Sequence, residues 1–233
     1  MASVREIQTA LNAKGFSPGA VDGAWGRNTI AAVKAFQAAN GLTADGIVGP
    51  RTLEKLFPGV PAAAGGSHPA VWYEEAKRLL GVREGPGAAD NPVILDWADD
   101  LDIHYPHDDI PWCGLFVAHC VGSTLPDEPL PVNPLGAKNW GRFGQTSSAA
   151  PGAVLVFWRE SPTSGKGHVG FYHGEDAAAY HVLGGNQGDR VSVARVAKNR
   201  LIANGIRRPS SFPVLAGGPV SGGATGALSQ NEA

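Results

Sequence analysis

Near its midpoint the chain reads Pro111-Trp-Cys-Gly-Leu-Phe-Val-Ala-His-Cys-Val121. Counted from Cys113, the third, fourth, seventh and eighth positions are Phe116, Val117, Cys120 and Val121. Apolar residues at this spacing line one face of an α-helix, and Pro111 limits any helix upstream. The pattern therefore predicts a helix that begins at Cys113, with the thiol at its N-terminal end.

A thiol at a helix start can become a nucleophile. Unpaired backbone N–H groups and the positive end of the helix dipole stabilise the thiolate, which is the reactive form of cysteine. Cys120, two turns further along the same face, is interpreted as core filling. Seven helical positions span roughly 10 Å, more than the ~7 Å that a disulfide allows, so both thiols are expected to be free. From position alone, a purely structural role for Cys113 remains open.

A nucleophilic cysteine needs a base, which is usually a histidine. Among the seven histidines, His168 follows the turn-rich segment Pro162-Thr-Ser-Gly-Lys-Gly167 and opens the β-type run Val169-Gly-Phe-Tyr172. A histidine at the mouth of a strand can reach a facing helix terminus. The alternative interpretation is a surface histidine at a loop–strand junction.

The base in turn needs a group that orients its ring. The runs 168–173 and 179–184 are expected to pair antiparallel, which places the histidine opposite Asn186, whose amide can accept from an imidazole N–H. A slip of one residue would bring Gly185 there instead. Asp189 is the second candidate for the orienting group.

The N-terminal part contains an internal repeat of the form D-G-x-x-G-x-x-T. It occurs at Asp22–Thr29 and again at Asp45–Thr52, 23 residues later. Each Asp-Gly pair is typical of a tight turn. The next glycine can cap a helix, which Pro50 would begin in the second copy. Three helices are expected: one from Val4 to near Gly15, one between the repeats through Ile30, Val33, Phe36 and Gln37, and one over about Pro50–Leu56.

The remaining composition indicates the domain boundaries. Residues 58–69 are rich in Pro, Gly and Ala, as in a linker, and the Gly, Ser and Ala of 215–233 predict a disordered tail. Within 70–214, helical stretches precede short β-type runs at about 153–158, 168–173, 179–183 and 192–196, which is typical of an α+β domain. We therefore expect a three-helix domain at 1–57 and an α+β domain with a central antiparallel sheet at 70–214.

Both domains resemble families of cell-wall proteins. Residues 4–57, with their two repeats and the stretch Ala-Val-Lys-Ala-Phe-Gln-Ala-Ala-Asn-Gly-Leu, resemble the peptidoglycan-binding module of many wall hydrolases. The second domain resembles the NlpC/P60 and CHAP superfamily of papain-like wall hydrolases. The stretches that carry this resemblance are Pro111–Val117, Pro151–Trp158, Gly167–Phe171 and Leu183–Gln187.

The second resemblance implies a set of site residues. It makes Cys113 the nucleophile, His168 the base and Asn186 the orienting residue, although many NlpC/P60 members use a second histidine there, so Asn favours the CHAP-like variant. Trp112 and Gln187 are candidates for substrate binding; the alternative for Trp112 is a place in the core.

The implied activity is hydrolysis of an amide bond in peptidoglycan without a cofactor. The bond is either the muramoyl–L-alanine linkage or one within the stem or cross-bridge peptide. A phage-type endolysin is the leading interpretation; a secreted antibacterial effector and a non-catalytic wall-anchoring protein are the alternatives. A zinc amidase is disfavoured because His104, His107, His173 and His181 form no HExxH pattern, so no metal is expected.

Charge and hydropathy limit the partners. The net charge of −2 gives no strong field toward nucleic acid or anionic lipid. No apolar run approaches the ~20 residues of a membrane span, and the first residues lack the apolar core of a signal peptide. We therefore expect a monomer that is made in the cytoplasm and acts on the wall, without a nucleic-acid partner or membrane insertion.

Overall fold

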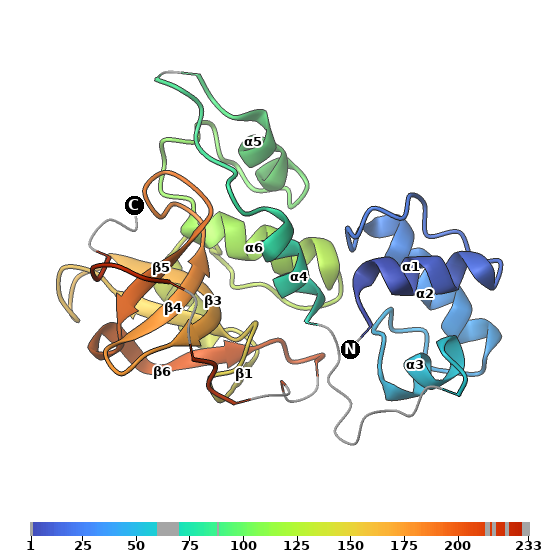
Figure 1. Cartoon of the computed structure of the whole chain (residues 1–233). Helices are drawn as coiled ribbons and strands as arrows, with labels where there is room; N and C mark the ends of the chain where they lie inside the picture. The colour runs from blue at the N-terminus through green and yellow to red at the C-terminus, as the bar shows by residue number, and fades with distance from the viewer. Residues whose placement is uncertain are drawn as a thin grey trace.

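The computed structural model describes residues 2–59, 70–87, 89–212, 215, 218–221 and 224–229. They form an N-terminal helical domain and a larger domain of mixed helix and antiparallel sheet (Figure 1). This agrees with the α+β class expected from the sequence. Most of the expected linker, from residue 60 to residue 69, lies outside the described residues.

The helical domain has the three predicted helices, α1 (Val4–Ala13), α2 (Arg27–Ala39) and α3 (Pro50–Leu56). α1 begins with a capping box, in which Ser3 and Glu6 satisfy each other's backbone N–H groups. The glycines of the two repeats are the N-caps of α2 and α3, and Pro50 takes the first helical position of α3, as expected. Their apolar faces meet in a core that includes Ile7, Leu11, Val33 and Phe36.

Two buried glutamines hold the repeated turns in the same way. The side-chain amide of Gln8 donates to Asp22 (3.1 Å) and to Thr29 (3.1 Å), and its oxygen accepts from the Gly23 N–H (2.9 Å). Gln37 makes the corresponding bonds to Asp45 (2.8 Å), Thr52 (3.2 Å) and the Gly46 N–H (2.8 Å). The repeat is thus a hydrogen-bonded unit, since the Asp and the Thr of each copy bind one glutamine side chain.

The second domain places its helices ahead of a six-stranded sheet. The helices are α4 (Val71–Arg78), α5 (Pro92–Asp99) and α6 (Cys113–Thr124), with short 3-10 turns η1 (Ala137–Arg142) and η2 (Lys198–Arg200). The strands are β1 (Gln145–Thr146), β2 (Val154–Trp158), β3 (Gly167–Glu175), β4 (Ala179–Gly184), β5 (Ser192–Ala197) and β6 (Leu201–Arg208). They lie in the order β1-β6-β2-β3-β4-β5, and every neighbouring pair is antiparallel.

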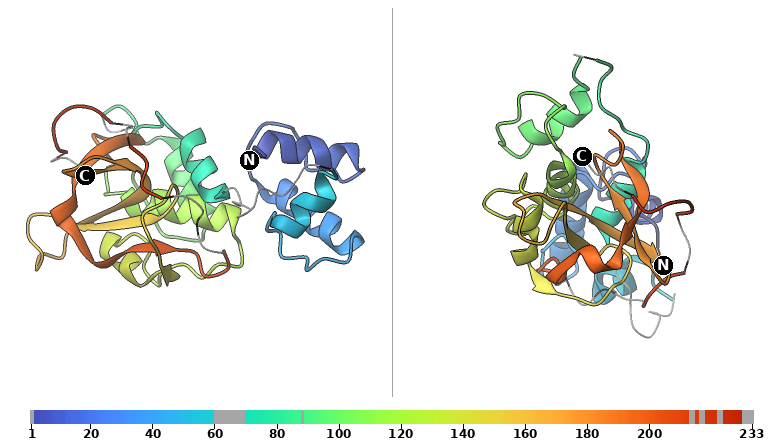
Figure 2. Two further views of the ribbon diagram at one scale, coloured as in Figure 1. Left: turned by 60° about the horizontal axis from the view of Figure 1, so that its bottom comes forward. Right: turned by 90° about the vertical axis from the view of Figure 1, so that its left-hand side faces the viewer.

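Helix α6 is the centre of this domain. It packs against β3 and β4 on one side and against α4 and α5 on the other, and its residues from Cys113 to Val121 are all buried. The helical domain lies beyond α4 and α6 from the sheet (Figure 2). A helix that is packed on all sides cannot shift easily, so the position of its first residue is well defined.

The described residues of the C-terminal stretch lie along the sheet. Val220 exchanges bonds with β3, accepting from the Glu175 N–H (2.8 Å) and donating to the Tyr172 hydroxyl (2.9 Å). Ser229 donates to the Arg195 carbonyl on β5 (2.8 Å). These residues are held because strand edges offer them backbone partners, a factor that composition does not report. No helix in the described part of the chain is long and apolar enough to cross a bilayer.

Candidate active site

Cys113 is the first residue of α6 and is 3% exposed. Burial raises the pKa of its thiol, because the thiolate loses hydration. The backbone N–H groups of Val169 and Gly114 act in the opposite direction, since both hydrogen-bond to the sulfur. The thiol is therefore held in a cradle that favours the anion once formed, but it requires a base to take its proton. Both cysteines are free, as predicted.

The contact with Val169 brings Cys113 next to the residue that follows His168. Val169 follows His168 in β3, and α6 packs directly on this strand. His168 is fully buried at the start of β3. The helix start and the strand start therefore meet, which is the juxtaposition expected from the sequence.

His168 is hydrogen-bonded through its Nε2 atom to the side-chain oxygen of Gln187 (3.1 Å). The amide nitrogen of Gln187 lies among backbone carbonyls, at 2.6 Å from that of Ser192 and 3.2 Å from those of Val182 and Gly184. Since carbonyls only accept, these contacts assign the nitrogen and leave the oxygen to face the imidazole. His168 therefore carries its proton on Nε2, and Nδ1 is the nitrogen with a lone pair.

The contact expected from Asn186 is thus made by Gln187, which had been assigned to substrate binding. Continued from the pair Phe171↔Leu183, the register places position 186 across from His168, whereas a bulge between Tyr172 and Gly174 shifts the pairing nearer the turn. However, β4 ends at Gly184, and Asn186 has a left-handed backbone (φ 53°) that turns its side chain out of the strand pattern. Asn186 is buried, and its oxygen has no hydrogen-bond partner among the described residues.

Asp189, the second candidate, lies on the same loop and is exposed, with φ 60°. Its carbonyl accepts from the Glu84 N–H (3.0 Å).

Two glycines allow the end of β4 to approach the site closely. A Cβ atom at Gly184 would lie 3.1 Å from both His168 Nε2 and the Gln187 oxygen, so it would crowd their hydrogen bond. At Gly185 it would lie 2.6 Å from carbon atoms of Phe116 and Trp112. The Gly-Gly pair therefore has a packing function that the strand pattern did not reveal.

Trp112 belongs to the core. Its side chain is fully buried, donates through Nε1 to Glu84 (2.8 Å) and packs at an angle on Trp97, with ring centroids 6.0 Å apart. A fully buried indole offers no face to a substrate, so the expectation that Trp112 lines the groove is wrong. Its place beside Cys113 makes it a support for the helix start.

A cavity of about 400 Å³ leads to the thiol. Its lining includes Cys113, Leu135 and Gly167 together with the cationic side chains Arg159 and Lys166. Sequence reasoning did not identify these two cations; the turn-rich segment before His168 was the available signal. An opening with positive charge at its rim suits a substrate that carries carboxylates.

Of His104, His107, His173 and His181, the last three have protein partners. His173 is bonded to the Tyr73 hydroxyl (2.7 Å), His181 to Asp176 (2.8 Å) and His107 to Asp90 (3.2 Å). Among the described residues, no three or more His, Cys, Asp or Glu side chains are grouped as metal ligands would be.

Comparison with known proteins relates the N-terminal domain to a family. Residues 1–56 match the family model described as "Putative peptidoglycan binding domain". The "N-acetylmuramoyl-L-alanine amidase CwlM" of Mycobacterium tuberculosis is 38% identical over 93 residues, or 40% of this chain and 22% of that protein. The "Probable N-acetylmuramoyl-L-alanine amidase" of Bacillus licheniformis is 47% identical over 61 residues, or 24% of this chain and 17% of that protein.

The chain thus spans about a fifth of the length of these curated relatives. No solved structure gives a significant match. The N-terminal domain is accordingly similar to peptidoglycan-binding domains, and part of the chain is similar to proteins named as N-acetylmuramoyl-L-alanine amidases.

Proposed function

We propose that this chain is a cysteine-dependent peptidoglycan hydrolase of the NlpC/P60–CHAP type, which cleaves a muramoyl–L-alanine or stem- or cross-bridge-peptide amide. The observation that carries the proposal is that the start of α6 packs on the start of β3, where Cys113 lies beside the backbone of Val169, the residue after His168. The peptidoglycan-binding match at 1–56 and the amidase-named relatives support peptidoglycan as the substrate.

In the proposed reaction His168 Nδ1 takes the proton of Cys113, and the thiolate attacks the amide carbonyl. Backbone N–H groups at the start of α6, including that of Cys113, stabilise the oxyanion. The imidazolium then protonates the leaving amine, and the acyl group remains on sulfur as a thioester. His168 finally activates a water molecule, whose attack releases the acid and restores the thiol.

Gln187 is proposed as the orienting residue. Its oxygen accepts from His168 Nε2–H, which holds the tautomer that has a lone pair on Nδ1. The amide is itself fixed by three backbone carbonyls, so the imidazole has one preferred orientation. In this proposal Asn186 is a structural residue of the turn that follows β4.

The domain at 1–57 is proposed to hold the enzyme on the wall and so to raise its local concentration there. The pairing of such a domain with a hydrolase suits a lytic protein of the phage-endolysin type that acts as a monomer on peptidoglycan.

The proposal is tested by inhibition of digestion of purified sacculi. Iodoacetamide should abolish digestion, because alkylation removes the Cys113 nucleophile, whereas EDTA should have no effect. Peptide mapping should find the label on Cys113, since Cys120 is fully buried. Loss of activity in EDTA with full activity after alkylation of Cys113 would reject the cysteine mechanism in favour of a metal-dependent one. Mass spectrometry of the products identifies the bond.

A further inference from the structure

The cavity at the proposed nucleophile is lined by side chains of two kinds. One part of the lining is apolar and consists of Pro111, Leu135 and Ala137. The loop between β2 and β3 supplies two cations, Arg159 and Lys166. Among the described residues, no carboxylate belongs to this lining. A ligand that suits the cavity therefore combines small apolar groups with negative charge.

The two cations differ in how far their charge is already balanced. Lys166 Nζ lies 2.6 Å from a carboxylate oxygen of Glu160, and both side chains are largely exposed. The pKa of Glu160 is lowered chiefly by this bond to Lys166 and least by the charge of Arg159. Glu160 thus belongs to Lys166, and Arg159 supplies the main positive charge at the cavity.

The charge of Arg159 reaches the thiol. Burial raises the pKa of Cys113, and the Arg159 guanidinium is among the groups that act against burial and lower it. Arg159 is partly buried and lines the same cavity as the thiol. An anionic group of a substrate whose amide lies at Cys113 would therefore meet this guanidinium.

The backbone of Arg159 is held at the base of its loop. Its N–H donates to the Lys166 carbonyl (3.1 Å), which continues the pairing of β2 with β3 by one step. Its carbonyl accepts from the Ser161 N–H (2.7 Å) and from the Ser164 hydroxyl. His168 is the second residue of β3, so the base of the loop and the proposed catalytic base are part of one hairpin. A donor that is fixed in this way is preorganised for binding.

A further lysine braces the tip of the loop. Lys138, in η1, donates through its ammonium group to the carbonyls of Pro162 (3.1 Å) and Ser164. Its charge is therefore used within the protein and is not directed at a ligand. Because η1 also contributes Ala137 to the lining, the loop and η1 form one frame around the cavity.

We propose that Arg159 binds a free carboxylate of the stem peptide beside the scissile amide, so that the enzyme prefers stems with free carboxyls to stems whose carboxyls are amidated. The proposal rests on the proposed hydrolase function and adds a specificity-determining residue to it. A guanidinium forms two parallel N–H···O bonds with a carboxylate, whereas a primary amide offers one acceptor oxygen and no charge. The methyl group of a neighbouring alanine suits the apolar part of the lining.

The test compares purified sacculi that have free stem carboxyls with the same sacculi after conversion of those carboxyls to primary amides. The readout is the initial rate at which new amino ends appear. The parent chain should digest the free-acid sacculi faster, by about tenfold or more. Arg159→Gln should lose this preference, because its rate falls mainly on the free acid. Arg159→Lys should keep part of it, since it retains the charge without the planar fork.

The ratio of the two rates separates substrate binding from the effect on the thiol. Loss of Arg159 also removes a charge that lowers the pKa of Cys113, but this change acts equally on both substrates and cancels in the ratio. Arg142→Gln is the matched control, because Arg142 is an exposed arginine of the same domain outside the lining of this cavity. It should keep the preference of the parent chain.

Two results would overturn the carboxylate proposal and leave the hydrolase function standing. One is equal digestion of both preparations by the parent chain. The other is an equal factor of loss on both preparations in Arg159→Gln with a normal melt; should that variant not fold, Arg159→Lys is compared in the same way. If the parent chain digests neither preparation, the proposed hydrolase function itself fails.

Discussion

At the scale of single residues, the proposed mechanism depends on which ring nitrogen of His168 carries the proton. Gln187 oxygen faces Nε2, and three backbone carbonyls hold the amide nitrogen in place. A glutamate at this position would direct a carboxylate at those carbonyls. The amide N–H groups of the glutamine are therefore needed as donors. Asn186, one residue earlier, shares the loop but not the contact.

These contacts predict different outcomes for the two neighbouring amides. Gln187→Ala should lower kcat by roughly 10–1000-fold with little change in KM, since it removes a supporting hydrogen bond of the base. Gln187→Glu should not restore the rate, because its carboxylate meets the same carbonyls. Asn186→Ala is the control and should retain most of the activity. Steady-state kinetics on a soluble muropeptide measure all three, and a crippled Asn186→Ala beside a normal Gln187→Ala would reverse the assignment.

At the scale of elements, one buried ion-pair network links α4 to α6. Glu75 on α4 accepts from Arg78 on the same helix and from His119 on α6. Loss of its charge would leave the cation and the imidazole without their acceptor. The packing of the two helices should therefore depend on pH.

The direction of this pH dependence follows from the pKa of Glu75, which is lowered to about 2. A depressed carboxyl pKa stabilises the fold fully above its unfolded value near 4.5 and less as the pH falls toward 2. The shift corresponds to about 3 kcal/mol. We expect the melting temperature to fall between pH 5 and pH 2, and to fall less steeply in Glu75→Gln, which is less stable at neutral pH. Thermal melts across this range measure it; parallel curves for the two proteins would count against the network.

The elements also show how far sequence reasoning reaches. Helical spacing predicted α6 from its first residue, and β-type runs predicted β3 and β4 as an antiparallel pair, without the bulge between Tyr172 and Gly174. β6 was not predicted, because Asn204-Gly205 is typical of a turn; in the structure Asn204 has φ 57°, and a Cβ at Gly205 would lie 2.8 Å from the Val156 carbonyl. The turn residues there allow a strand to pack closely instead of ending it.

The candidate site, too, could be predicted from the sequence only in part. Cys113 and His168 follow from the starts of their elements, whereas Gln187 depends on how the chain curls after Gly184. That curl is set by tertiary contacts of a Gly-Gly pair with α6, which no local pattern contains. For the same reason the burial of Trp112 could not be decided from its place beside the nucleophile.

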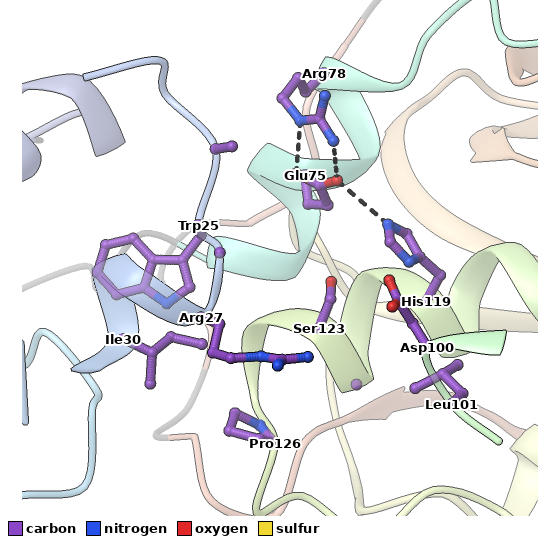
Figure 3. Close-up of a pocket in the computed structure, with 13 residues that line it drawn as sticks. Trp25, Arg27, Ile30, Glu75, Arg78, Asp100, Leu101, His119, Ser123 and Pro126 are labelled. Carbon is purple, nitrogen blue, oxygen red and sulfur yellow. Dashed lines mark hydrogen bonds and ion pairs between the residues drawn. The ribbon is translucent and has the colours of Figure 1, made fainter. Parts of the chain in front are cut away.

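At the scale of the whole molecule, the two domains share a face. An ion pair joins Lys34 on α2 to Asp127 after α6 (3.0 Å). This pair is exposed and contributes little by itself. The helical domain also supplies lining residues to a cavity that α4 and α6 complete (Figure 3).

A chain that begins at residue 70 should therefore lose activity unevenly. Digestion of whole walls should fall strongly, because the tether that raises local concentration is gone. Hydrolysis of a short muropeptide should be affected less, since the cleft at Cys113 is retained. Pull-down on insoluble peptidoglycan should show reduced retention. Equal loss on both substrates, with retention unchanged, would contradict the role assigned to 1–57.

The central claim is that Cys113 is the nucleophile, and the direct measurement is release of new amino and carboxyl ends from purified sacculi by matched cysteine variants. Cys113→Ala should release none above background while keeping a normal melt. Cys120→Ala should remain active and lose about 1–2 kcal/mol of stability, because a small buried side chain is removed. Undiminished release by folded Cys113→Ala would contradict the account.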